Sequence, residues 1–75
     1  MKEALCYVLN NIVDNPESVN ISYEENNDIC KFRINADNSD RGKIIGKNGK
    51  TIKALRNIFS MIGRKNNKKV FIEIV

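Results

Sequence analysis

The chain has 75 residues, a formal net charge of +4, two cysteines and no histidine. This length accommodates one small domain, residues 1–75, and leaves no room for a second. The mild basicity is compatible with a nucleic-acid partner, whereas the lack of histidine and of a C-x-x-C motif argues against a zinc-type metal site.

The N-terminus and the cysteines bear on where the protein works. Residues 1–4 carry an early acid and no signal-like apolar core, and no apolar run approaches bilayer length. We therefore expect a cytoplasmic protein without membrane association. Cys6 and Cys30 do not form a disulfide framework, so we expect two reduced, partly buried thiols.

The first half of the chain predicts a helix followed by a hairpin. Apolar residues recur at helical spacing in residues 2–14, and Asn15-Pro16 is expected to end that helix. Residues 19–23 alternate between apolar and polar and predict a strand. A turn at 25–28 leads into a second alternating strand, 30–36, and the two strands should pair with one face covered.

The second half predicts two helices around a glycine loop, and then a last strand. A short helix over 40–45 precedes the loop at 46–49, and Ile52, Leu55, Phe59 and Ile62 mark one face of the next helix. Gly63 fits a helix stop, and residues 70–75 alternate as a strand. The predicted class is α+β, a three-stranded sheet with helices packed on one face.

The stretch between Ile45 and Ile52 is the most informative in the chain. Gly46 and Gly49 have no Cβ, so the backbone of this loop can approach a ligand closely. The helix that follows presents unpaired N–H groups and the positive end of its dipole. No acid occurs in the basic segment 41–56, whose cations are Arg41, Lys43, Lys47, Lys50, Lys53 and Arg56. This pattern predicts a site for a sugar-phosphate backbone.

A second basic group, Arg64, Lys65, Lys68 and Lys69, is interpreted as a solvated loop.

An enzyme is not expected. Gly49-Lys50-Thr51 resembles the end of a P-loop, but that motif requires a glycine where Ile44 stands. A P-loop also follows a strand, whereas this loop follows a predicted helical turn. The chain is also too short for the parallel sheet and metal-holding acid of a nucleotide hydrolase. No nucleophile has a plausible base, so we predict no catalytic residues, no metal and no cofactor.

In its element order and its loop, the sequence resembles a KH domain. The match runs from Ile45 through Gly46-Lys47-Asn48-Gly49 to Ile52, in the α-β-β-α-α-β order of the type II, prokaryotic-style arrangement. In length and stand-alone form it resembles the small single-KH bacterial RNA-binding proteins of the KhpA group. That resemblance implies that the Gly-x-x-Gly (GXXG) loop clamps about four nucleotides of single-stranded RNA. It also implies a role as a post-transcriptional regulator or RNA chaperone.

The resemblance also implies roles for particular residues. Gly46 and Gly49 would admit the RNA backbone, and Lys47 and Asn48 would face its phosphates. The groove beside the loop would be lined by Ile44, Ile45 and Ile52, with Phe32 or Ile34 as its opposite wall. Positive charge around this groove would come from Lys43, Lys50, Lys53 and Arg56.

Less specific interpretations stay open. The lysines can form an ordinary solvated helix face, the isoleucines are more often core than ligand contacts, and Lys31, Arg33 and Asn35 are expected simply to face solvent. An alternative function is assembly: the domain would form a homodimer, or pair with a larger KH-containing protein, and bind RNA only weakly alone. The sequence does not separate RNA from single-stranded DNA, or give a base preference, a dimer surface or a cellular pathway.

Overall fold

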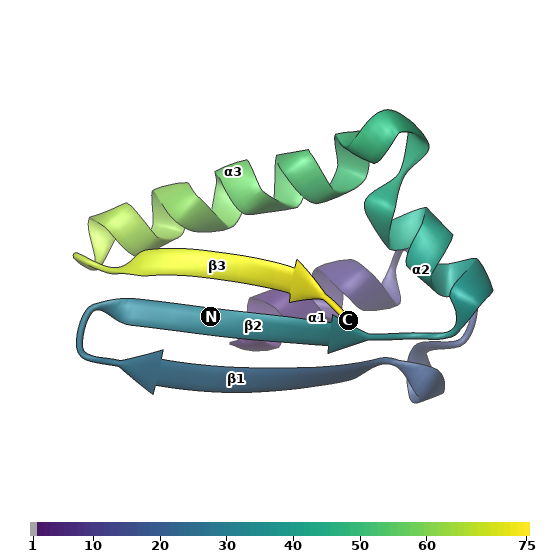
Figure 1. The fold of residues 1–75 in the computed structure, drawn as a ribbon, viewed down its shortest axis with the longest axis horizontal. Helices are drawn as coiled ribbons and strands as arrows, with labels where there is room; N and C mark the ends of the chain where they lie inside the picture. Colours follow the sequence, from purple (N-terminus) through teal and green to yellow (C-terminus); the bar gives the residue numbers. More distant parts are fainter. Residues whose placement is uncertain (1) are drawn as a thin grey trace.

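The computed structural model describes residues 2–75, which form three helices, three strands and two short 3-10 turns (Figure 1). The elements are α1 (Lys2–Asn10), a turn (Pro16–Ser18), β1 (Asn20–Asn26), β2 (Ile29–Asn35), α2 (Asn38–Ile45), a turn (Lys47–Gly49), α3 (Lys50–Lys65) and β3 (Lys69–Ile74). The predicted α+β class and the order α-β-β-α-α-β are confirmed.

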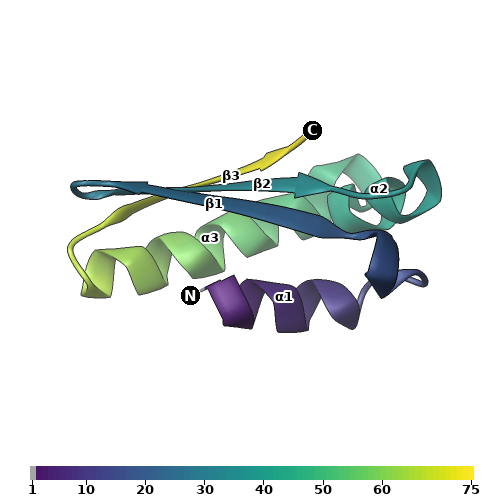
Figure 2. The same cartoon turned by 90° about the horizontal axis from the view of Figure 1, so that it is seen from below.

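The sheet is mixed, with strand order β1-β2-β3. β1 and β2 pair antiparallel as a hairpin, whereas β2 and β3 pair parallel because two helices and the glycine loop lie between them. Figure 2 shows α1 and α3 on the same side of the sheet, with α2 at the end where β2 finishes. The opposite face of the sheet has no helix over it among the described residues.

The core lies between that sheet face and the helices. In β2, Cys30, Phe32 and Ile34 are fully buried, while the residues between them are exposed, as the alternation predicted. From α3, Leu55 and Phe59 pack against this layer. Each of these large side chains contributes on the order of 1.5–3 kcal/mol by leaving water, so both stripes contribute strongly to the stability of this small domain, as do the buried Leu5 and Leu9 of α1.

Several predicted boundaries were wrong by a few residues, and turn residues explain most of the differences. α1 ends at Asn10 rather than at residue 14. Directly after Asn10, the Asn11 side chain donates a hydrogen bond to the Tyr7 carbonyl (2.8 Å). β1 continues to Asn26, because Asn27 adopts a positive φ of 49° and closes a two-residue turn with Asp28. β2, β3 and α2 each begin one or two residues earlier than predicted.

Gly63 does not end α3, which continues to Lys65. Its role is close packing: a Cβ at this position would stand 2.6 Å from Val70 Cγ2 and 2.7 Å from the Lys68 carbonyl oxygen. The left-handed residue after the helix is Asn67, with a φ of 58°. Glycine therefore lets α3 lie against the start of β3.

Hydrogen bonds to two other parts of the chain hold α2 in place. Asp40 is fully buried, and its carboxylate oxygens accept hydrogen bonds from the backbone N–H groups of Asp14 (3.1 Å) and Asn15 (3.0 Å). On the other side, the Arg41 guanidinium donates to the Val75 carbonyl (2.6 Å). Because α2 leads directly into the glycine loop, these bonds fix where the loop stands relative to the sheet.

Candidate nucleic-acid interface

The glycine loop turns the chain sharply between α2 and α3. Three of its four residues have positive φ: Gly46 (77°), Asn48 (58°) and Gly49 (73°). Backbone hydrogen bonds from Gly46 N–H to the Gly42 carbonyl (2.9 Å) and from Gly49 N–H to the Gly46 carbonyl (3.1 Å) hold the turn closed. The loop is therefore a defined structure with an exposed tip, Lys47 and Asn48.

Gly46 is the most constrained residue of the loop. Its φ of 77° and ψ of 170° lie in a region that is essentially restricted to glycine. A Cβ there would stand 2.3 Å from Thr51 Oγ1 and 2.8 Å from the Thr51 backbone nitrogen. Gly49 is less crowded, since a Cβ there would come no nearer than 4.0 Å to the Ile52 side chain.

The N-terminus of α3 favours an anion. Its N-cap residue is Gly49, which supplies no side-chain acceptor to the first N–H groups, and its first turn holds no acidic residue. The unpaired N–H groups and the dipole therefore act together with Lys47, Lys50 and Lys53, whose side chains are exposed. A phosphate group fits this chemistry.

The three isoleucines differ in what they offer a ligand. Ile44 is 0% exposed and Ile52 is 6% exposed, so both serve the core. Ile45 is 36% exposed and is the member of the set that provides apolar surface beside the loop.

Two of the predicted cations already have partners in the domain. Lys43 forms an ion pair with Asp14, in the segment that follows α1. The Arg56 guanidinium donates to the Ile72 carbonyl from Nε (3.2 Å) and from Nη2 (3.1 Å). Val75 N–H bonds to the Ile34 carbonyl, so the backbone groups of Val75 face β2. Backbone groups alternate in direction from one residue of a strand to the next. The Ile72 carbonyl, three residues before Val75, therefore points to the free edge of β3.

The predicted opposite wall of the groove was wrong. Phe32 and Ile34 are both fully buried and present no surface to a ligand. A hollow of about 290 Å³ instead borders α3 and β3, lined by Arg56, Ser60, Val70, Phe71, Ile72 and Glu73. Phe71, 46% exposed, borders this hollow and was not among the predicted site residues. Its signal was an aromatic residue out of phase with the buried positions of its strand.

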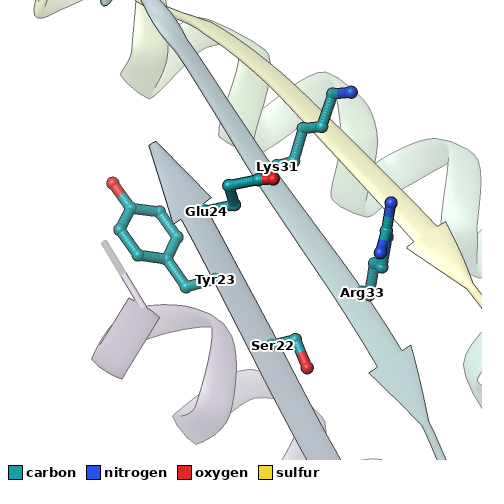
Figure 3. Close-up of a pocket in the computed structure, with 5 residues that line it drawn as sticks. All are labelled: Ser22, Tyr23, Glu24, Lys31 and Arg33. Carbon is teal, nitrogen blue, oxygen red and sulfur yellow. The ribbon is translucent and has the colours of Figure 1, made fainter. Parts of the chain in front are cut away.

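A second, smaller hollow lies on β1 and β2, away from the loop. Its lining residues are Ser22, Tyr23, Glu24, Lys31 and Arg33 (Figure 3). It measures about 50 Å³, and Arg33 in it forms an ion pair with Glu73 (3.5 Å). This hollow is too small to hold a nucleotide, and its exposed strand residues fit the solvent-facing interpretation.

Within residues 2–75, no group of three or more His, Cys, Asp or Glu side chains is arranged to hold a metal ion. No helix in the same range combines the length and apolarity needed to span a membrane.

Comparison with known proteins identifies the family. A sequence model described as "KhpA/KhpB, KH domain" matches residues 2–74. Proteins named RNA-binding protein KhpA are similar over the whole chain. The one from Chlamydia caviae is 40% identical over 75 residues, covering 100% of this chain and 96% of its own length. Those from Listeria monocytogenes (35% identical, 100% and 99% covered) and Bacillus subtilis (32% identical, 99% and 91% covered) are also similar.

No solved structure gives a significant match. The family is defined by an RNA-binding type of domain and is not an enzyme family. The full-length family match, the element order and the GXXG loop agree, and the chain belongs to the KhpA/KhpB KH-domain family.

Proposed function

We propose that this protein binds single-stranded RNA, with its GXXG loop clamping the backbone of about four nucleotides. The observation that carries the proposal is the loop itself: the half-buried Gly46 and Gly49, both with positive φ, turn the chain at the acid-free N-terminus of α3, between exposed lysines. The relatives that match the whole chain are named as RNA-binding proteins, which supports the same function.

The phosphates would lie against the loop. Lys47 and Asn48 stand at its exposed tip, and Lys50 and Lys53 follow on the first turns of α3. Lys43 becomes available only when its ion pair with Asp14 opens, which costs little because exposed ion pairs of this kind contribute at most about 1 kcal/mol. This electrostatic part holds the strand without reading its sequence.

The bases would lie between α3 and β3. Ile45 offers an apolar contact at the loop end, and Arg56 and the exposed Phe71 line the hollow that borders α3 and β3. The two hydrogen bonds to the Ile72 carbonyl hold Arg56 in place, so its planar group is fixed at the edge where a base edge would arrive. Only an unpaired base can enter this hollow, so a single strand should bind better than a duplex.

The experiment is a salt titration of binding by fluorescence anisotropy, with short labelled single-stranded RNA pools. If two or three phosphates are neutralised, log K should fall with log [salt] at a slope of roughly −2. A duplex of the same length is the control and should bind more weakly. Failure of the single strand to bind, or a slope near zero, would contradict the clamp.

In the cell, such a passive RNA clamp suits a post-transcriptional regulator or RNA chaperone in the cytoplasm. One module with a single short site binds weakly, so a second copy or a KH-bearing partner would raise avidity through effective concentration.

A second candidate function, assembly, is favoured by one observation. Ile58 (51% exposed) and Met61 (56% exposed) lie one turn apart on the outer side of α3, where they form an apolar patch on a small basic protein. If assembly is the main function, light scattering should show the mass doubling as the concentration rises, and Met61→Asp should keep the protein monomeric. A constant monomer mass at the highest concentration would exclude the homodimer.

A further inference from the structure

The second basic group is largely solvent-exposed but does not form one loop as predicted, because Arg64 and Lys65 lie in α3 and Lys69 lies in β3. Arg64, Lys68 and Lys69 line a hollow of about 480 Å³ together with Asn57, Ser60, Val70 and Phe71, and no acidic residue lines it. Figure 1 shows that this end of α3, where the chain turns into β3, is the end farthest from α2 and the glycine loop.

Two of these cations are available to a ligand. Lys68 pairs with Glu25, whose carboxylate raises the pKa of Lys68 through their hydrogen bond and has its own pKa lowered by it. Arg64 and Lys69 are exposed, and neither forms an ion pair with another described residue. A neighbouring hollow is lined by the same three cations and also by Asp28. The side of the cation group that has no acid therefore faces the line along which α3 and β3 lie next to each other, here called the α3–β3 seam.

The hollow at this end is continuous with the one proposed to hold bases. Both are lined by Ser60, Val70 and Phe71. On α3, Arg56, Ser60 and Arg64 are spaced four residues apart and therefore lie along one side of the helix. Phe71 borders both hollows from β3, and its ring, on the sheet face opposite to the buried Ile72, is exposed and can stack with a base.

The α3–β3 seam is longer than a stacked strand of four nucleotides. At a helical rise of about 1.5 Å per residue, the distance from Lys50 to Arg64 along α3 is about 21 Å. A stacked strand advances about 3.4 Å per nucleotide, so about six nucleotides span it. A stacked strand of four nucleotides that begins at the glycine loop would end before Arg64.

We propose that Arg64 and Lys69 form a second phosphate site, which a longer single-stranded RNA reaches along the α3–β3 seam while the GXXG loop holds its other end. This inference rests on the proposed function and extends it. It makes affinity depend on RNA length, with a gain when the strand becomes long enough to reach the far end of α3.

The test compares a four-nucleotide and an eight-nucleotide RNA of the same base composition, by anisotropy, on the wild type and on Arg64→Ala/Lys69→Ala. The double variant should bind the shorter RNA within twofold of the wild type and the longer one about tenfold more weakly. Its salt slope for the longer RNA should be smaller in magnitude by about 1.4, because two phosphate contacts are lost.

A matched control removes the same charge elsewhere. Lys2→Ala/Lys65→Ala changes two exposed cations that line neither hollow of the seam, and should leave both affinities within about twofold. Equal losses in the two variants, or equal losses on both RNA lengths, would reduce the effect to net charge and overturn the second site. Wild-type protein that binds neither RNA would overturn the clamp as well, so the two failures are distinguishable.

Discussion

Reversing the charge at the tip of the glycine loop is expected to abolish RNA binding while leaving the fold intact. The variant is Lys47→Asp/Asn48→Asp, which keeps both glycines. Lys47 and Asn48 are exposed, and Asn48 has a φ of 58° that aspartate also tolerates, so the loop backbone should not change. Two carboxylates then stand where a phosphate would lie, and the affinity should fall on the order of 100-fold.

The measurement is anisotropy on the short RNA pools, with circular dichroism to show that the variant still folds. The control is Lys2→Asp/Asn10→Asp, which makes the same two residue changes at exposed positions of α1 and alters the net charge equally. This control should lose far less affinity, because its new carboxylates are distant from the loop in sequence and sit on another helix. Similar losses in the two variants would mean that binding depends only on overall charge.

The elements that could be predicted from the sequence are those with a local periodic pattern. The alternation in β2 and the helical spacing in α3 both placed the core residues correctly, because each pattern follows from one element burying one face. Element ends depend on single residues in a tertiary setting. Asn27 adopts left-handed backbone angles just after β1, and Asn67 does so just after α3. Gly63 resembled a helix stop, but it lies inside α3 because β3 packs against it.

The candidate site shows the same division. The loop residues are contiguous, so their spacing alone predicted a phosphate-binding turn. The hollow that borders α3 and β3, and the partners of the predicted cations, come from residues distant in the sequence. Lys43 pairs with Asp14, 29 residues earlier in the chain, and Arg56 bonds the Ile72 carbonyl, 16 residues later. Neither pairing can be recognised from the sequence, whereas the exposure of Phe71 follows from its position out of phase with the buried Ile72 of β3.

A series of glycine-to-alanine changes should separate loop geometry from helix propensity. Gly42 lies inside α2, and a Cβ there would have nothing within 4 Å, so Gly42→Ala should raise the free energy of unfolding by about 0.5–1 kcal/mol. At Gly49 the Cβ also has space but φ is 73°, so Gly49→Ala should cost about 1–2 kcal/mol from backbone strain alone.

Gly46→Ala should be the most damaging of the three. It combines a glycine-restricted conformation with a Cβ 2.8 Å from the Thr51 backbone nitrogen, which cannot move aside as a side chain can. We expect a loss of about 3 kcal/mol in the free energy of unfolding, or a loop that relieves the contact by changing shape. In either case RNA affinity should fall by more than about tenfold, because the clamp needs this backbone path. Chemical denaturation and anisotropy on all three variants provide the check. If Gly46→Ala binds as well as Gly42→Ala, the backbone of the loop is not what holds the RNA.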